Sequence, residues 1–361
     1  MGRRRKETAF YAVTITCCLI AMIVVVVAAL LIYDKLKGAS GEKTGEDQEV
    51  MAEIPLIYSQ NDMDAMVSDA VSKAVSETED KVKTETEEAL LSLISEGLST
   101  GKTVMGTLRP LYPDKIVVAS GGVYHFVPIN RNLMMHERLQ ENLQVLETGE
   151  FQYMEDGQVT SKKGIDVSLY QGNIDWQQVA ADGVEYVFIR VGYRGYGKEG
   201  RLVLDEKFTK NVEGAKAAGL KVGVYFFGQA ITVEEAKEEA NLVLEQLAPY
   251  QIDYPVVYDV EKVSAESGRA NALDATTRTD IVIAFLETVK AAGYTPMVYA
   301  NMEMFSVLLE FERLEQYDKW FAYYGEEMYF PYNYAVWQYT EKGTVAGIEG
   351  PVDMNISFKE W

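Results

Sequence analysis

The second half of the chain alternates eight short apolar runs with helical segments. The runs are rich in Val, Ile, Phe and Tyr, and they cover residues 163–168, 186–192, 221–227, 255–261, 296–300, 319–324, 334–339 and 352–357. Segments with a helical spacing of apolar residues lie between several of them, at 208–218, 233–247 and 277–292. Eight strands that alternate with helices within about 200 residues predict an α/β fold, a TIM-like (β/α) barrel. Because some of the later connections are too short for a full helix, we expect the barrel to be irregular.

The fourth apolar run, within residues 254–261, ends in two acids. Its β-branched composition is typical of a buried strand in a parallel sheet. Asp259 and Glu261 then fall at the carboxyl end of that strand, where barrel enzymes hold their catalytic groups. Because side chains alternate along a strand, both carboxylates face one pocket while Val260 packs behind them. Adjacent carboxylates separate their proton affinities and so supply an acid and a base at neutral pH. A solvated strand end is the alternative.

Histidine and cysteine are absent from Gly164 to the C-terminus. The histidines of the chain are His125 and His136, and its cysteines are Cys17 and Cys18. Cysteine nucleophiles, Ser-His-Asp triads and zinc sites with His or Cys ligands are therefore excluded from this region. Carboxylates must carry any chemistry there, and we expect no cofactor. The two histidines are expected to be structural or exposed.

The N-terminal segment differs in charge from the rest of the chain. The formal net charge is -21, yet the first forty residues contain six basic residues and two acidic ones. The acidic remainder would repel nucleic acid, so no nucleic-acid partner is expected. Residues 8–33 contain no charged residue and are long enough to cross a hydrocarbon core of about 30 Å as a helix.

This apolar segment predicts a single-pass anchor in the cell membrane, with the lipid bilayer as a partner. The basic residues within 1–7 place that tail in the cytoplasm and the chain after Asp34 outside the cell. A cleaved signal peptide, processed near Ser40, is the alternative. The apolar run exceeds a usual signal core and is followed by charged residues, which favours a retained anchor.

Residues 34–103 are predicted to form a linker and a helical stalk. The linker is rich in glycine and charged residues, and apolar residues then recur at helical spacing over 63–75. The heptad pattern fades between Thr78 and Glu88, which leaves self-association through the stalk open.

Residues 104–160 predict a small α+β module without visible chemistry. One hairpin turns at a Gly-Gly pair within 115–129, and another turns at an Asp-Gly pair within 149–161. Between them, 132–146 is expected to form a short helix. The barrel domain, 161–361, is expected to fold and to act without this module.

Five motifs of the predicted barrel lie at residues 163–176, 223–227, 254–261, 337–340 and 352–355. In order and spacing they resemble glycoside hydrolase family 25, the lysozymes (N-acetylmuramidases) that cut the β-1,4 bond between N-acetylmuramic acid and N-acetylglucosamine in peptidoglycan. The resemblance covers residues 163–361 without a departure at an acidic position. It implies a glycosidase that binds peptidoglycan glycan strands. Together with the predicted membrane anchor, this leads us to expect an enzyme that faces the wall of a Gram-positive-type bacterium.

The resemblance also implies roles for four acids. Glu261 would be the general acid/base, and Asp259 would stabilise positive charge at the reacting sugar or orient its acetamido group. Asp166 and Asp353 would complete an acidic floor, and the stereochemical outcome would be retention. The barrel geometry agrees, because closure brings the first and last strands, with Asp166 and Asp353, to one mouth. Alternatively, these two acids hold the barrel closed by hydrogen bonding.

Aromatic and polar side chains near the same mouth are candidates for sugar binding, because aromatic rings meet the apolar faces of sugars and polar groups bind their hydroxyls. The candidates stand on the third strand, on the seventh strand and in a Gly-rich loop after the second strand. They are Tyr225, Phe227, Trp337, Gln338, Tyr339 and Tyr193, with Tyr196 as a further rim residue.

Other acids are expected to be structural. Asp175 precedes Trp176 as the N-cap of a helix, because an aspartate accepts the free amides of a first turn. Four glutamates after residue 233 predict a solvated helix face, namely Glu234, Glu235, Glu238 and Glu239.

Three functional hypotheses are compatible with the acidic mouth. A muramidase is the leading one, since all four acids are present. A catalytically weak or inactive barrel that binds the wall as a scaffold is the second. In the third, the acids bind Mg²⁺ or Ca²⁺, because carboxylates also suit hard cations.

Overall fold

The computed structural model describes residues 60–101, 103–265 and 268–361. The chain divides into two compact units, 1–79 and 80–361. The predicted tail 1–7, the membrane segment 8–33 and the start of the linker lie outside the described residues. Within the described ranges, no helix is both long enough and apolar enough to cross a membrane.

Helix α2, Gln60–Ser99, occupies most of the predicted stalk. Ion pairs between residues four apart lie along it, with Lys73 Nζ 4.0 Å from Glu77 Oε1 and Lys81 Nζ 3.8 Å from Glu85 Oε1. Pairs of this spacing stabilise a helix by only about 0.3–0.5 kcal/mol each. Several apolar side chains of α2 are largely exposed to solvent, among them Val67 and Leu91.

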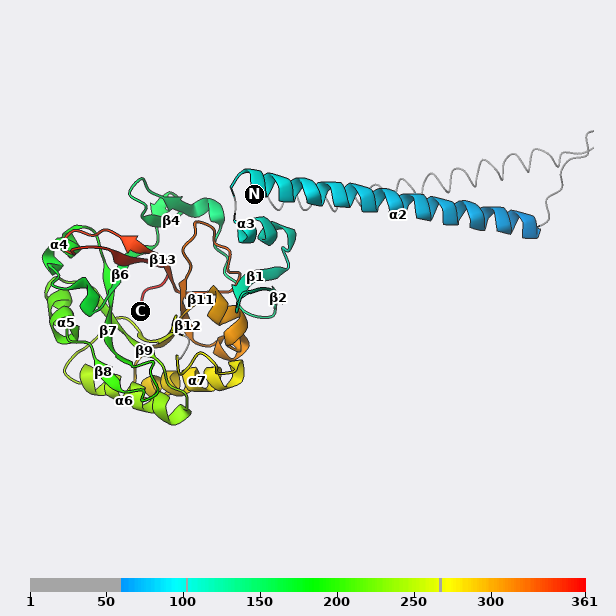
Figure 1. Cartoon of the computed structure of the whole chain (residues 1–361). Coiled ribbons are helices and arrows are strands. Elements are labelled where there is room, and N and C mark those ends of the chain that lie inside the picture. The colour runs from blue at the N-terminus through cyan, green and yellow to red at the C-terminus, as the bar shows by residue number, and fades with distance from the viewer. Residues whose placement is uncertain (1–59, 102, 266–267) are drawn as a thin grey trace, which may run out of the picture. The chain divides into compact units, whose positions relative to one another are not determined.

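All eight predicted strands form, and they close into a barrel (Figure 1). They are β6 Lys162–Val167, β7 Tyr186–Arg194, β9 Lys221–Gly228, β10 Val256–Val260, β11 Pro296–Asn301, β12 Asp318–Ala322, β13 Val336–Gly343 and β14 Val352–Ser357. Closure follows because β6 pairs with both β7 and β14. A short strand that the sequence pattern missed, β8 Leu202–Leu204, pairs with the end of β7.

The last strand runs against the others. Strands β6 to β13 of the barrel pair in parallel, whereas β14 is antiparallel to both of its neighbours. Only residues 344–351 separate β13 from β14, and a parallel crossover needs about a dozen residues or more. Strand β14 therefore starts at the mouth where the parallel strands end. This places Asp353, near its start, opposite Asp166, near the end of β6.

Helices cover the outside of the barrel between successive strands (Figure 1). They are α4 Trp176–Ala181, α5 Phe208–Ala217, α6 Val233–Leu247 and α7 Ala275–Ala291. The Asp175 side chain accepts the backbone N–H groups of Gln177 and Gln178, so its predicted role as an N-cap is confirmed. Between β11 and β12 the connection holds a π-helix, Met304–Leu308, and a 3-10 helix, Phe311–Leu314, which is the expected irregularity.

One predicted solvated residue on α6 is instead at the centre of a buried cluster. The Glu239 side chain is fully buried: Arg194 Nε lies 2.7 Å from its Oε1, and the Tyr258 hydroxyl donates to its Oε2 at 2.6 Å. The prediction of a solvated face was wrong at this position, because the buried guanidinium of Arg194 requires an anion beside it. Glu235 is also partly buried and pairs with Arg269 at 2.7 Å.

Both predicted hairpins of the 104–160 module form. The module contains α3 Val104–Leu108, η1 Arg109–Leu111, β1 Lys115–Ser120, β2 Val123–Pro128, η2 Gln140–Asn142, β3 Leu143–Val145, β4 Phe151–Glu155 and β5 Gln158–Val159. The β1–β2 turn places Gly121 and Gly122 at φ 58° and 80°, and the β4–β5 turn places Asp156 and Gly157 at φ 49° and 77°. Positive φ at both central residues matches the right-handed twist of the paired strands.

The predicted helix over 132–146 was wrong. This stretch is largely extended, and its backbone bonds to the barrel side: His136 N–H donates to the Pro331 carbonyl at 3.1 Å, and Asn333 N–H donates to the Met134 carbonyl at 2.9 Å. Partners of this kind replace the hydrogen bonds of a helix. His136 is structural, as expected, and burial lowers its pKa to about 4.

The module shares a hydrophobic core with the barrel. The Phe151 ring stacks on Tyr339 with a centroid separation of 4.2 Å and meets Trp337 edge-on at 5.3 Å. Ile116 and Val118 of β1 are buried in the same core. This packing opposes the expectation that the barrel domain is independent of the module.

We expect Phe151→Ala to destabilise the protein by about 3 kcal/mol, because it removes a ring that is only 7% exposed and leaves a cavity against Trp337 and Tyr339. Thermal unfolding of the full chain measures the effect. Val159→Ala, in the same hairpin but 49% exposed, is the matched control and should unfold near the wild-type temperature. Equal melting temperatures for the Phe151 variant and the wild type would show that the contact does not support the fold.

Candidate active site

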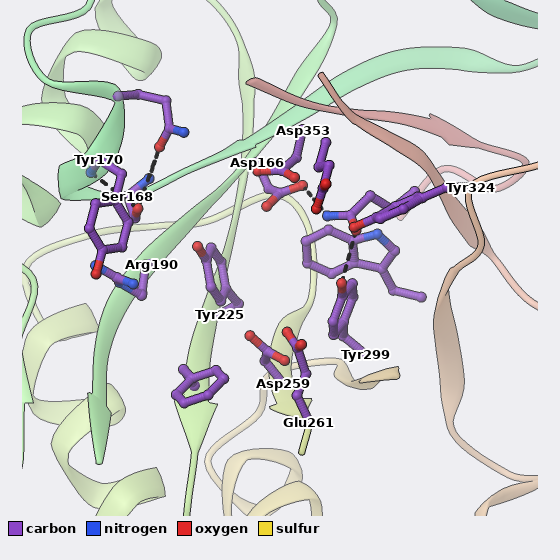
Figure 2. Close-up of a pocket in the computed structure, with 15 residues that line it drawn as sticks. Asp166, Ser168, Tyr170, Arg190, Tyr225, Asp259, Glu261, Tyr299, Tyr324 and Asp353 are labelled. Atoms are coloured by element: carbon purple, nitrogen blue, oxygen red, sulfur yellow. Dashed lines mark hydrogen bonds between the residues drawn. The ribbon is translucent and has the colours of Figure 1, made fainter. Parts of the chain in front are cut away.

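The carboxyl ends of the barrel strands surround a cavity of about 320 Å³, the first cavity (Figure 2). Five acidic side chains line it: Asp166, Asp259, Glu261, Glu341 and Asp353. Arg190 is the one basic side chain among the described residues that line it. The structure thus brings together the four acids predicted from sequence and adds Glu341, which stands on β13.

Asp259 and Glu261 lie side by side at the carboxyl end of β10, and both side chains line the first cavity (Figure 2). Burial, followed by the charge of Glu261, raises the pKa of Asp259 well above its ordinary value. Burial also raises the pKa of Glu261. Each carboxyl of the pair therefore holds a proton more tightly than it would in water. The Asp259 Oδ1 atom is buried and has no hydrogen-bond partner among the described residues.

Two side-chain amides fix the Asp166 carboxylate. Gln338 Nε2 and Asn355 Nδ2 both donate to its Oδ2 atom at 2.8 Å. Burial raises the pKa of Asp166 to about 6, and the two amide hydrogen bonds limit the rise. Asp166 is consequently ionised at neutral pH.

The orientation of both amides is set by further donors. The Gln338 Oε1 atom accepts the hydroxyl groups of Tyr299 and Tyr324, each at 2.9 Å. The Asn355 Oδ1 atom accepts Trp320 Nε1–H at 2.8 Å. With each carbonyl occupied by a donor, only the NH₂ group of each amide is left to face Asp166.

Asp353 faces Asp166 across the closure of the barrel (Figure 2). Burial, together with the negative charges of Asp166 and Glu341, raises the pKa of Asp353 to about 8. Asp353 is therefore largely protonated at neutral pH while Asp166 is charged. The pair avoids two adjacent anions in this way.

Arg190, on β7, was missed by sequence reasoning. Its Nε atom lies 2.8 Å from Asp205 Oδ2, and its guanidinium lies 5.1 Å from the Tyr170 ring centroid. Asp205 also accepts the Leu169 N–H at 3.0 Å, so this ion pair ties the 168–171 loop to the barrel. A charged residue inside an otherwise apolar run was the available signal.

Aromatic side chains form much of the remaining wall. Tyr225 and Phe227 line the first cavity, as predicted from their shared face of β9. Tyr170 is 78% exposed and Tyr324 is 52% exposed, and both stand at its rim. Neither was singled out from the sequence, because Tyr170 lies in a short 3-10 helix, Leu169–Gln171, and Tyr324 was expected inside the apolar run 319–324 but lies beyond the end of β12.

Two predicted sugar-binding residues lie on the opposite face of their strand. Gln338 lines the first cavity, so its neighbours Trp337 and Tyr339 point outward and pack against Phe151. Their placement in a glycan groove was wrong, since Trp337 is fully buried and donates to the Tyr323 carbonyl at 2.8 Å. Tyr193 does not line the first cavity either; its ring centroid lies 5.4 Å from the Arg190 guanidinium.

Among the described residues, no group of three or more His, Cys, Asp or Glu residues is arranged to hold a metal ion.

A closed α/β barrel with paired carboxyls at the carboxyl ends of its strands and aromatic rings at its rim defines a glycosidase type of site. The model of the glycosyl hydrolases family 25 matches residues 165–348. The chain belongs to this family. The resemblance found in the sequence motifs is thereby confirmed.

Relatives cover the same region. The chain is 31% identical over 203 residues to the protein YegX of Escherichia coli K12, a match that spans 54% of this chain and 68% of YegX. It is 27% identical over 194 residues to the autolytic lysozyme of Clostridium acetobutylicum, across 54% of this chain and 55% of that protein. The structure of the modular autolysin LytC from Streptococcus pneumoniae shares the fold, with a TM-score of 0.51 and 23% identity over 66% of this chain and 57% of LytC.

We expect Asp353→Asn to become more stable than the wild type as the pH rises from 5 to 8. A carboxyl whose pKa is raised from 3.8 to about 8 on folding binds a proton that the unfolded chain has released, so it lowers stability across that window. Asparagine cannot ionise, and the variant should gain roughly 1–3 kcal/mol relative to the wild type at pH 8.

Urea unfolding at pH 5 and pH 8 measures this gain. The control is Asp114→Asn, an exposed acid of the 104–160 module, for which the difference from the wild type should not change with pH. A difference for Asp353→Asn that stayed constant between the two pH values would contradict the raised pKa.

Proposed function

We propose that this family 25 glycosidase is a peptidoglycan hydrolase that cleaves the β-1,4 bond between N-acetylmuramic acid and N-acetylglucosamine. The adjacent carboxyls of Asp259 and Glu261, on the wall of an acidic cavity, are the observation that carries the proposal. Two relatives named as lysozymes support the choice of substrate, one from Clostridium acetobutylicum and one, 25% identical, from Streptomyces globisporus. Their names also favour an enzyme over a wall-binding scaffold.

In the first step Glu261 protonates the leaving glycosidic oxygen. The raised pKa values of the pair keep a proton available for Glu261 to deliver, and Asp259 is ionised once that proton has left. The carboxylate of Asp259 then stabilises the positive charge that develops at the anomeric carbon, or at the acetamido group when that group assists. The pair has then lost one proton, which leaves with the departing sugar, and has gained one negative charge.

In the second step the Glu261 carboxylate takes a proton from the attacking water. That proton returns the pair to its starting state. The other two acids support this cycle: Asp166 supplies a fixed negative charge, and Asp353 stays protonated so that it does not repel Asp166. Tyr170 and Tyr324 offer exposed rings against which sugar faces stack.

The proposed location is the outer face of the cell membrane, with the N-terminus in the cytoplasm. The charge-free residues 8–33 and the basic residues within 1–7 support a retained anchor. In the chain, the stalk helix α2 lies between the proposed anchor and the catalytic domain. Its exposed apolar residues, such as Val67 and Val71, provide a surface for self-association.

Glu261→Gln should lower the turnover of purified peptidoglycan by roughly 10²- to 10⁴-fold, the usual contribution of a general acid. Glutamine keeps the shape of the side chain but cannot donate the proton. Asp259→Asn should also lower turnover steeply, because it removes the charge that offsets the developing cation. Reducing-end release, with mass spectrometry of the released muropeptides, gives the rate and the bond that is cut.

Glu234→Gln, at the exposed first turn of α6, is the control for replacing a glutamate and should retain the wild-type rate. Thermal unfolding of each variant separates a loss of chemistry from a loss of folding. Wild-type turnover in a folded Glu261→Gln protein would refute the assignment. A wild-type chain that binds peptidoglycan without cutting it would support the scaffold instead.

The orientation of the chain is tested on intact protoplasts. Protease added outside should degrade the 161–361 region, because the basic tail keeps the N-terminus inside. A cytoplasmic protein measured in the same sample reports any leakage. Protection of the 161–361 region in sealed protoplasts would overturn the proposed topology.

A further inference from the structure

A second cavity of about 400 Å³ adjoins the first one at the barrel mouth. The two cavities share Glu261, Tyr299, Tyr324 and Glu341, so Glu261 lies where they meet. The predicted acids Asp166, Asp259 and Asp353 line the first cavity and not the second. The three other predicted acids therefore all lie on one side of Glu261.

The lining of the second cavity suits a sugar. Asn301 and Glu303 supply polar groups, while Met302, Ala322 and the ring of Tyr323 supply apolar surface. Sugars require this combination, because their hydroxyls need hydrogen-bond partners and their C–H faces pack on aromatic rings. A general acid at the junction of two such cavities protonates an oxygen that links one sugar in each.

Two walls of the second cavity are held by the 104–160 module. The Ser120 hydroxyl donates to Glu303 Oε1 at 2.6 Å, and Arg109 Nη1 donates to the Tyr323 hydroxyl at 2.6 Å. Lys262 Nζ also lies 3.1 Å from the same Glu303 oxygen. Glu303 and Tyr323 are thus oriented partly by residues outside the 165–348 family match.

Ser120 and Arg109 are themselves held in fixed positions. Ser120 is the last residue of β1, directly before the Gly-Gly turn, and is 9% exposed. The guanidinium of Arg109 lies 4.0 Å from the Tyr329 ring centroid. The Tyr329 hydroxyl in turn accepts the Val117 N–H of β1 at 2.7 Å, which ties the loop after β12 to the module.

We propose that Ser120 and Arg109, both from the 104–160 module, are positioning residues for Glu303 and Tyr323 in the second cavity, on the leaving-group side of Glu261. The proposal rests on the proposed glycosidase function, because it uses Glu261 as the acid that separates the two sugars. The 104–160 module then contributes to substrate recognition without touching the substrate.

The test compares two substrates in the full chain. Peptide-free glycan strands place a sugar in the second cavity, whereas an aryl β-glycoside of the disaccharide has an activated leaving group that needs no sugar there. Ser120→Ala and Arg109→Gln should lower kcat/KM on glycan strands roughly 5- to 20-fold, chiefly through KM, as the loss of one well-placed hydrogen bond predicts. On the aryl glycoside both should stay within about twofold of the wild type.

Two further variants sharpen the comparison. Arg109→Lys keeps a donor near the Tyr323 hydroxyl and should recover part of the loss. Asn130→Ala removes a different hydrogen bond between module and barrel, from Asn130 Nδ2 to Glu312 Oε1 at 2.9 Å, and should match the wild type on both substrates. Calorimetric binding of a glycan tetrasaccharide in a Glu261→Gln background measures the same effect without turnover, and adding Ser120→Ala should weaken it by a similar factor.

Unchanged kinetics and binding on glycan for both the Ser120 and the Arg109 variants would overturn the proposal, and so would equal losses on the two substrates. Either result leaves the proposed function intact, since the wild type still cuts both. A wild type that cuts neither substrate would instead refute the proposed function, and the tetrasaccharide binding would then still decide whether the second cavity holds a sugar.

Discussion

The pairing of β6 with β14 is the constraint on which the site depends. Because β14 is antiparallel, its first residues lie at the mouth where the parallel strands end, and Asp353 faces Asp166. The same register brings Asn355 within 2.8 Å of the Asp166 carboxylate. A parallel last strand would place these side chains at the other end of the barrel. The short connection before β14 thus decides both how the barrel closes and where its acids gather.

Closure of the barrel brings several acids close together, and their negative charges would repel one another if all were ionised. Five acids around one small cavity cannot all be ionised at neutral pH without a large cost. Raised pKa values reduce the charge: Asp353 stays largely protonated beside an ionised Asp166, and the pKa values of Asp259 and Glu261 are both raised. Amide donors then stabilise the charge that remains on Asp166.

The sequence predicted what depends on local periodicity and failed where tertiary contacts decide. Eight strands and the helices α5, α6 and α7 followed from apolar spacing, and the four acids followed from their positions at strand ends and from the family motifs. The sequence did not predict which side chains of β13 point into the barrel. A strand that is buried on both faces shows no alternation of polar and apolar residues, so nothing indicated that Gln338 points inward. The 132–146 stretch was missed because its backbone partners belong to the barrel. Tyr324 lies in a loop and Arg190 inside an apolar run, where charge and aromaticity alone do not reveal a direction.

Because the core around Phe151 is shared, the folding unit of this protein is larger than the barrel alone. A barrel that is transplanted alone into another gene would carry Trp337 and Tyr339 uncovered on its outer wall. A gene fusion that begins at the start of the family match would therefore encode a barrel with an exposed apolar patch, which favours aggregation. The segment that can move between genes, or be fused to a different anchor, has to begin upstream of β1. We therefore expect the barrel and the 104–160 module to be retained or lost together in evolution.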